Sequence, residues 1–325
     1  MKQVQFGESS FKVSQIGLGM AALGRPGYIN LSHNEDVIDT SEEKMEAHAQ
    51  HMLQKAVDFG ITYIDAAQSY GKAEQFLGRW LKDSTYGRHL NVGSKWGYYY
   101  TAEWEIDASV HEIKDHTIDR LAQQWPESKE RLGANLKLYQ IHSATFESGV
   151  LENRAVLEKL EEIRHKGYVI GLSLSGPNQA EVLRDAMKVR IGGSPLFGSV
   201  QATFNLLEQA VRPALQKAYD NGLGVIVKEG LANGRLTSRN DEAFVKILGS
   251  VAAKHQVSVD AIALAYIMQE DFVTTVLSGA VTEAHLRSNV TAKKVALDMA
   301  DLMVLSNVKM DSEKYWNQRS KLTWN

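Results

Sequence analysis

The sequence of 325 residues contains no cysteine, only five prolines, no long apolar run and no block of basic charge. The absence of cysteine excludes disulfides and thiolate chemistry. A formal net charge of −3 without a basic stretch gives no indication of a nucleic-acid partner. No segment approaches the ~20 apolar residues of a membrane span, and the opening MKQVQFGESS lacks the apolar core of a secretion signal. We therefore expect a soluble cytoplasmic protein without a membrane or nucleic-acid partner.

Short apolar strands that alternate with amphipathic helical stretches dominate the chain. Hydrophobic residues make up 44% of it, which is enough for a large core. Helical periodicity marks residues 41–60, where Ser41 is the predicted N-cap, and then 151–167, 178–190, 207–222, 241–256 and 258–270. Eight strands are predicted, at residues 14–20, 61–67, 89–95, 136–142, 168–174, 199–205, 222–229 and 272–279.

This alternation fits a closed (β/α)8 TIM barrel that forms a single domain over residues 1–325. The alternative, an open doubly wound sheet, would require a G-x-G-x-x-G motif between the first strand and the first helix. The segment GLGMAALG matches that motif only superficially, because it runs into a predicted loop at residues 25–40. Residues 4–14 predict an N-terminal hairpin that could plug the bottom of the barrel, and extra helices are expected near the C-terminus.

Polar and titratable side chains stand where the predicted strands end. In a barrel of this type the functional groups lie at the C-terminal ends of the strands, which share one rim. A purely structural barrel would not need such groups there. The residues in question are Asp65, Lys95, His142, Ser173, Gln201, Lys228 and Gly279.

Three of these side chains form a coherent acid–base set with Tyr70, which stands five residues beyond Asp65. A tyrosine is a poor acid because its ordinary pKa is about 10, and a lysine ammonium beside it lowers that pKa. Lys95 could supply this charge, with Asp65 as the partner that a buried lysine needs. Tyr70 would then donate a proton to a carbonyl oxygen that His142 orients. No side chain supplies a hydride, so the set predicts a nicotinamide cofactor.

The same residues resemble the Asp–Tyr–Lys–His tetrad of the aldo-keto reductase superfamily. The matching motifs are D-x-A-x-x-Y-G from Asp65, S-K-W-G around Lys95 and L-Y-Q-I-H ending at His142. The resemblance implies a barrel reductase that binds NAD(P)(H) at its rim, with Tyr70 as general acid and base, Lys95 as tuner of its pKa, Asp65 as holder of Lys95, and His142 at the carbonyl. The cofactor-binding positions it implies are Gly19, Met20, Ser173, Gln201, Lys228, Leu231, Gly279, Ala280, His285 and Asn289.

The chain departs from the family pattern at several cofactor positions. Leu174 stands where many members have an asparagine, and Lys228 stands where many have an aromatic residue that stacks on the nicotinamide. Val281 and His285 stand where NADP-preferring members commonly have Arg, Lys or Gln, and Arg287 is expected to point outward. NADP(H), the family default, is therefore only weakly favoured over NAD(H).

Aromatic residues on the rim loops are expected to wall a pocket for a small carbonyl compound or sugar. The predicted pocket residues are Tyr28, Trp96 and Phe146. No metal site is predicted, because His111 and His116 have neither cysteine nor a carboxylate cage nearby and are expected on a solvated helix face.

Two other functions remain open at the level of sequence. A cofactor-binding regulatory or sensing subunit with little turnover would also use this rim, and the changes at Leu174 and Lys228 are compatible with it. A barrel aldolase with Lys95 as a Schiff base would have no use for Tyr70 and His142 in this arrangement. The sequence does not indicate the oligomeric state.

Overall fold

The computed structural model describes residues 1–31, 33–37 and 39–325. Eight parallel strands close into a barrel, each hydrogen-bonded to two neighbours, with the last strand pairing with the first. This is the (β/α)8 TIM barrel expected from the sequence, and every predicted strand is present. The barrel strands are β3 (Ile16–Gly19), β4 (Tyr63–Asp65), β5 (Asn91–Trp96), β8 (Leu136–Ala144), β9 (Val169–Leu174), β12 (Ser199–Thr203), β13 (Gly224–Lys228) and β14 (Thr275–Ser278).

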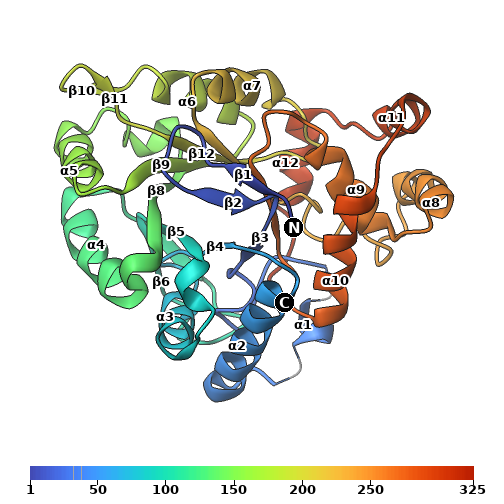
Figure 1. The fold of residues 1–325 in the computed structure, drawn as a ribbon, viewed down its shortest axis with the longest axis horizontal. Coiled ribbons are helices and arrows are strands. Elements are labelled where there is room, and N and C mark those ends of the chain that lie inside the picture. The colour runs from blue at the N-terminus through green and yellow to red at the C-terminus, as the bar shows by residue number, and fades with distance from the viewer. Residues whose placement is uncertain (32, 38) are drawn as a thin grey trace.

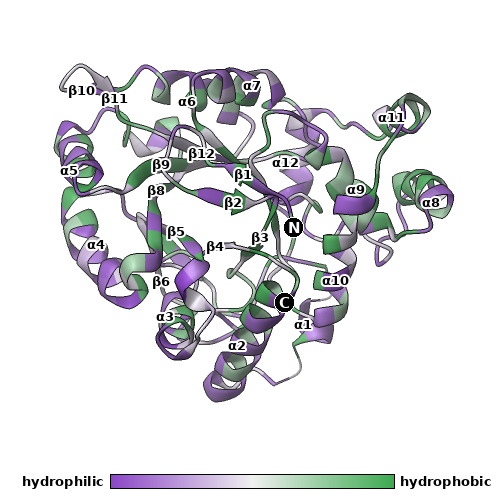
Figure 2. Cartoon of the chain, in the orientation of Figure 1, coloured by the Kyte–Doolittle hydropathy of each residue, from purple (hydrophilic) through white to green (hydrophobic). Residues whose placement is uncertain are grey.

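Most of the helices surround the barrel, with their apolar faces toward the strands and their polar faces in solvent (Figures 1 and 2). The last two are the extra helices expected near the C-terminus. Within the described part of the chain, no helix is both long and apolar enough to cross a membrane. The helices are α1 (His33–Asp36), α2 (Glu42–Asp58), α3 (Ala73–Asp83), α4 (Ile118–Leu132), α5 (Arg154–His165), α6 (Gln179–Ala186), α7 (Arg212–Asp220), α8 (Ala243–His255), α9 (Val259–Met268), α10 (Glu283–Thr291), α11 (Met299–Ser306) and α12 (Ser312–Arg319).

The predicted N-terminal hairpin is formed by β1 (Gln3–Gln5) and β2 (Lys12–Ser14), which pair antiparallel and cross the middle of the strand ring in Figure 1. The hairpin closes the bottom of the barrel with a separate apolar cluster. Phe6 is fully buried there, and its ring stacks on Tyr63 at 6.2 Å between centroids. Gly224 is required beneath it, because an added Cβ would lie 2.6 Å from the Phe6 ring. The other members of the cluster are Val13, Leu138 and Ile226.

Several local expectations need correction. The predicted loop at residues 25–40 contains the short helix α1, while Ser32 and Ile38 lie outside the described residues. Ser41 is the N-cap of α2, but its hydroxyl donates to Asp39 at 2.8 Å and caps no backbone N–H of the helix. The segment 111–120 is not one helix face, because β7 (Glu112–Lys114) pairs with β6 (Tyr98–Tyr100) before α4 begins.

The remaining short elements are peripheral to the barrel. A small hairpin of β10 (Arg190–Ile191) and β11 (Ser194–Pro195) precedes β12. The 3-10 turns are η1 (Gly87–His89), η2 (Gly133–Asn135), η3 (Phe146–Ser148) and η4 (Ala292–Lys294).

Candidate active site

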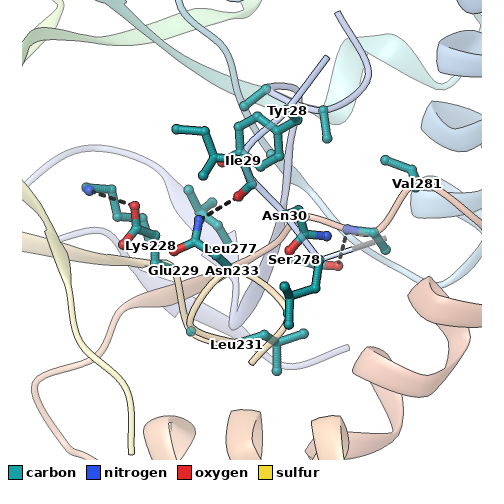
Figure 3. A pocket seen from close by; sticks show the side chains of 18 of the residues that line it. Tyr28, Ile29, Asn30, Lys228, Glu229, Leu231, Asn233, Leu277, Ser278 and Val281 are labelled. Carbon is teal, nitrogen blue, oxygen red and sulfur yellow. Dashed lines mark hydrogen bonds and ion pairs between the residues drawn. The ribbon is translucent and has the colours of Figure 1, made fainter. Parts of the chain in front are cut away.

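A cavity of about 700 Å³ opens at the C-terminal rim of the barrel, a volume typical of small-molecule sites. Its walls come from the ends of the strands and the loops that follow them, and it extends from Tyr70 and His142 to α10. Figure 3 shows the part of the wall that includes Tyr28, Lys228 and Leu231. The predicted site residues that line the cavity are Gly19, Tyr28, Asp65, Tyr70, His142, Gln201, Lys228, Leu231, Gly279, Ala280, His285 and Asn289.

Asp65 and Lys95 form a buried ion pair beneath this cavity. Asp65 lies opposite Gly93 in the β4–β5 ladder, so Lys95 stands two residues further along β5 and its side chain turns back to Asp65. The Lys95 ammonium donates to Asp65 Oδ1 and, at 2.8 Å, to the Ala66 carbonyl. Lys95 has no exposed side-chain surface, so its charge depends on these two acceptors.

The second oxygen of Asp65 connects the pair to two neighbouring strands. Asp65 Oδ2 accepts from Gln201 Nε2 at 2.8 Å and from the Tyr63 hydroxyl at 3.2 Å. These bonds satisfy the lone pairs that a buried carboxylate needs to have satisfied. Asp65 therefore fixes Lys95 and Gln201 relative to one another.

Tyr70 lies over this pair on the turn between β4 and α3. Its ring centroid is 5.0 Å from Lys95 Nζ and 5.5 Å from the His142 ring. The turn depends on Gly71, which has a φ of +56° and whose added Cβ would lie 2.4 Å from the Gly24 carbonyl oxygen. A larger residue at position 71 would displace Tyr70 from the cavity wall.

The electrostatic environment of Tyr70 differs from the one expected from the sequence. Burial raises the pKa of Tyr70 well above 10, the nearby Asp65 carboxylate adds to this effect, and Arg25 opposes it. Asp65 neutralises Lys95, so the lowering of the Tyr70 pKa that was expected from Lys95 does not outweigh the effect of burial. Tyr70 is therefore protonated at neutral pH and is equipped to donate a proton.

His142, on β8, is the fourth residue of the acid–base set and is a neutral imidazole. Burial lowers its pKa well below 6.5, and the charges of Lys95 and Lys228 lower it further. Its Nδ1 lies 3.4 Å from the Ser69 hydroxyl, and the Tyr98 ring packs at 4.8 Å between centroids. A neutral ring with one N–H can orient a carbonyl without adding charge to the site.

His116 holds the backbone of His142 in place. Its Nε2 lies 2.8 Å from the His142 carbonyl oxygen, which can only accept, so the proton is on Nε2. Its ring packs edge-on against Trp96 at 5.7 Å and Tyr98 at 6.1 Å. The expected solvated position of His116 is thus wrong, because it is buried beneath the active site.

Arg25 and Glu112 form a charged pair at the cavity wall that the sequence did not reveal. Arg25 Nη1 donates to Glu112 Oε2 at 3.1 Å and to the Ser69 carbonyl at 3.2 Å. The guanidinium carbon lies 5.3 Å from the Tyr70 ring centroid and 4.5 Å from that of Trp324. These two residues are 87 positions apart and no motif links them, so only the folded loops bring them together.

Besides Lys95, which lies beneath the cavity, four predicted residues are placed away from the cavity wall. Met20 and Trp96 are fully buried in the core between barrel and helices, and Phe146 is 47% exposed on η3. Ser173 is buried, and its Oγ accepts from the Ser143 N–H at 2.8 Å. None of these four is among the described residues that line the cavity.

The far end of the cavity, at α10, carries acidic as well as basic groups. Asn289 donates to Asp260 at 2.7 Å and accepts from the Ser278 hydroxyl at 2.7 Å. Asp36 forms a bidentate pair with Arg239 at 2.6 and 2.8 Å and lies 3.7 Å from His285 Nδ1.

Neither position 281 nor position 287 supplies a positive charge to this end of the cavity. Val281 lines the cavity, and its carbonyl lies 2.6 Å from His48 Nε2. Arg287 points outward on the exposed face of α10, where it pairs with Glu283 at 2.7 Å. Across the residues that the structure describes, no group of three or more His, Cys, Asp or Glu could hold a metal ion.

Two loops meet across the cavity between its two ends. Asn233, in the loop after β13, donates to the Ile29 carbonyl at 2.9 Å, and its own carbonyl accepts from the Leu31 N–H at 3.1 Å (Figure 3 shows the first bond). At the mouth, Trp324 stacks on His111 at 3.9 Å between centroids and lines the cavity.

A closed barrel whose rim cavity lies over a tyrosine, a histidine and a buried lysine–aspartate pair defines a TIM-barrel protein with a candidate active site at its C-terminal rim. The family follows from comparison with known proteins: residues 15–308 match the Aldo/keto reductase family, and this chain belongs to it. The family implies an oxidoreductase that uses a nicotinamide cofactor.

Individual relatives have low sequence identity to this chain, although the matches cover nearly its full length. The NADH-specific methylglyoxal reductase of Escherichia coli is 24% identical, with 94% of this chain and 97% of that protein covered. L-glyceraldehyde 3-phosphate reductase of the same organism is also 24% identical, with 89% and 88% covered. The holo form of an aldo-keto reductase from Bacillus halodurans superposes with a TM-score of 0.71 at 22% identity, covering 95% and 96% of the two chains. At this identity the structural likeness establishes the fold.

Proposed function

We propose that this chain, acting as one domain over residues 1–325, reduces a small aldehyde, ketone or sugar carbonyl to the alcohol, or catalyses the reverse reaction. The observation that carries the proposal is the convergence of Tyr70 and His142 on one end of a cavity, directly above the buried Asp65–Lys95 pair. The cavity then continues to α10, which leaves room for an extended cofactor. A bound nicotinamide supplies the hydride, which no side chain can supply.

The residues along the cavity fit such a cofactor. An added Cβ at Gly279 would meet nothing within 4 Å, and one at Gly19 would meet only the Ser278 carbonyl oxygen at 3.5 Å, so the backbone is open to the cavity at both positions. Gln201 faces the reactive end, while Leu231 and Asn289 line the middle and the far end. We infer that these residues hold the cofactor, with the Asn233–Ile29 bridge covering it.

Tyr70 acts as the proton donor in this proposal. Its raised pKa keeps the phenol protonated at neutral pH, as a donor to a developing alkoxide must be. His142, held neutral, orients the carbonyl oxygen toward the phenol. Lys95 is enclosed by Asp65 and the Ala66 carbonyl without exposed surface, which argues against the aldolase alternative, because a Schiff-base lysine must reach its substrate.

The charges at the far end favour NAD(H) over the NADP(H) that the family default suggested. Asp36 already engages Arg239 and lies beside His285, and Asp260 adds a second carboxylate to the same wall. A 2′-phosphate there would face two carboxylates, whereas a ribose hydroxyl could donate to one of them. We therefore propose that NADH binds at least as tightly as NADPH.

The substrate end is polar, which favours small hydrophilic carbonyl compounds. Arg25, Glu112 and Lys114 line the cavity next to Tyr70 and His142, and Trp324 adds one aromatic wall. Charged hydrogen-bonding groups beside an aromatic face suit hydroxylated or phosphorylated short-chain aldehydes better than apolar ketones. Methylglyoxal and glyceraldehyde 3-phosphate, named for two relatives, belong in the first substrate panel.

The test is a calorimetric titration with NADH and NADPH, followed by addition of the aldehyde panel and a spectroscopic record of reduced-cofactor consumption. Binding together with consumption is the expected result. Cofactor binding without cofactor consumption over a broad aldehyde panel would instead favour the alternative function, a regulatory or sensing subunit. Binding of neither NADH nor NADPH would overturn the proposal.

Cofactor selection is tested with Asp36→Asn, which keeps the shape of the side chain and removes its charge. The variant should bind NADPH on the order of tenfold more tightly, because one carboxylate no longer opposes the phosphate. Its affinity for NADH should not rise, because the ribose hydroxyl gains no new acceptor. Glu283→Gln on the outer face of α10 is the matched control. Equal NADPH affinities for Asp36→Asn and the wild type would contradict the assignment.

A further inference from the structure

Lys228 is a largely enclosed cation at the reactive end that the acid–base set does not use. It ends β13 opposite Thr203 of β12, and its ammonium donates to Thr203 Oγ1 at 3.0 Å. Its side chain is 17% exposed and lines the same cavity as Tyr70 and His142, as Figure 3 shows for the wall that Lys228 forms with Glu229. A buried ammonium facing a ligand cavity is costly to maintain and calls for a function.

The charge of Lys228 is only partly neutralised. Glu229 lies 3.7 Å from the ammonium, but the same carboxylate also accepts from Arg319 at 2.7 Å. Burial alone would raise the pKa of Glu229, yet Lys228 and Arg319 outweigh burial and bring it to about 2. One carboxylate therefore serves two cations, and this group retains one positive charge.

Two other cations near the reactive end, both fully or almost fully buried, are paired one to one, whereas Lys114 is exposed to solvent. Lys95 is matched by Asp65, and Arg25 is matched by Glu112. The charge of Lys228 acts on the active site. It is the third-largest cause, after burial and Lys95, of the lowered pKa of His142. The group around Lys228 thus makes the reactive end net positive.

We propose that Lys228 makes this site select the reduced, neutral nicotinamide ring over the oxidised, positively charged ring. The inference rests on the proposed function, which places the ring next to Tyr70 and His142. An unmatched ammonium repels the oxidised ring and has little effect on the reduced ring. The oxidised cofactor therefore leaves readily after each turnover, and the site favours operation in the direction of carbonyl reduction.

The test measures affinity for both redox forms, so it does not depend on turnover. Calorimetry gives dissociation constants for NADH and NAD⁺ with the wild type, with Lys228→Met, which removes the charge, and with Lys228→Arg, which keeps it. The ratio of the oxidised to the reduced dissociation constant should fall on the order of tenfold in Lys228→Met, for loss of one charge at an effective dielectric constant of about 20. The ratio should stay near the wild-type value in Lys228→Arg.

Lys114→Met is the matched control. Lys114 also lines the cavity, but it is exposed and donates to the Ser143 carbonyl at 3.0 Å, so solvent screens its charge and the ratio should not move. An independent readout is the midpoint potential of the bound couple, which should fall by about 30 mV in Lys228→Met for a tenfold change in the ratio.

The outcomes separate this inference from the proposed function. If both redox forms bind and Lys228→Met leaves the ratio unchanged, the role of Lys228 is overturned and the reductase remains. If neither form binds to the wild type, both fall together. If Lys228→Met does not fold, Lys228→Gln takes its place, and the same change in ratio is required of it.

Discussion

The two ends of the barrel are built from opposite kinds of side chain. The bottom is closed by the β1–β2 hairpin, where Phe6 packs on Tyr63 and Leu138 in a cluster without charge. The rim holds the charged pairs Asp65–Lys95 and Arg25–Glu112 around one cavity. Close packing at the bottom stabilises the fold, whereas buried charges at the rim contribute little net stability and are retained for chemistry.

Tyr63 and Asp65 place this contrast within one short strand. Tyr63 belongs to the apolar bottom cluster, and its hydroxyl donates at 3.2 Å to Asp65, two residues nearer the rim. Side chains two positions apart in a strand point to the same side, so both face the barrel interior. Three residues thus span the change from packing to chemistry, and substitutions at the two ends should have separable effects.

The largest effect is expected from Asp65→Asn, which breaks the rim pair without changing its shape. Lys95 would be left as a buried, uncompensated charge, at a cost of about 3–5 kcal/mol in the free energy of unfolding. Turnover should fall as well, since both Lys95 and Gln201 lose their anchor. Urea unfolding checks the stability, with Asp185→Asn as a control because its pair with Lys188 is exposed. Equal stabilities of Asp65→Asn and the control would contradict a buried pair.

Phe6→Ala tests the opposite end. Truncation of a fully buried aromatic ring leaves a cavity and should lower the free energy of unfolding by about 3 kcal/mol. The kinetic constants of the folded protein should be unchanged, because Phe6 is remote from the rim. Urea unfolding and steady-state kinetics on the same sample check both statements. A loss of kcat similar in size to that of Asp65→Asn would show that the two ends are not separable.

Acid should destabilise the protein through its buried histidines before the carboxylates titrate. Burial lowers the pKa values of His33 and His116 from 6.5 to about 4. Between these values the unfolded chain binds more protons than the folded one, so this stability is complete above pH 6.5 and is lost as pH falls toward 4. Each histidine adds a slope of up to about 1.4 kcal/mol per pH unit. Urea midpoints from pH 7 to 4.5 measure the slope.

His116→Gln should reduce that slope by the share of one histidine, while stability at pH 7 also falls because the bond to the His142 carbonyl weakens. Identical slopes in the wild type and His116→Gln would refute the assignment of a buried neutral imidazole at this position.

The smallest effect concerns the bridge between the ends of the cavity. Asn233→Ala removes the bond to the Ile29 carbonyl and should speed cofactor dissociation by about five- to tenfold, the value of one net hydrogen bond. Asn240→Ala is the matched control, since Asn240 bonds to the Arg235 carbonyl within its own loop. Stopped-flow displacement of bound NADH measures both rates, and equal rates would mean that the bridge does not retain the cofactor.

The parts of the fold that depend on periodicity were predictable. The eight barrel strands, the N-terminal hairpin and the extra helices at the C-terminus follow from apolar runs and turn residues, and the structure confirms them. Asp65, Lys95 and His142 were predictable as a group because each follows an apolar run toward the same rim. Their proposed roles and that of Tyr70 stay predictions.

The errors and omissions at the pocket have two different causes, one that the sequence could have avoided and one that it could not. Trp96 was expected in the pocket, but it follows Lys95 directly, so the alternation of side chains along β5 sends it to the opposite face and into the core. That signal was present in the sequence. No comparable signal exists for Arg25, Glu112 or Trp324, because their meeting at the cavity wall is set by three segments far apart in the chain: a loop, the start of β7 and the C-terminal tail.

The measurement that tests the account most directly is turnover of Tyr70→Phe alongside calorimetric binding of reduced cofactor to the same preparation. The account predicts that the cofactor binds as it does to the wild type while turnover falls by about 10²–10⁴-fold, the contribution typical of a positioned general acid. Turnover equal to that of the wild type would contradict the assignment of Tyr70 as proton donor and, with it, the proposed mechanism of the rim.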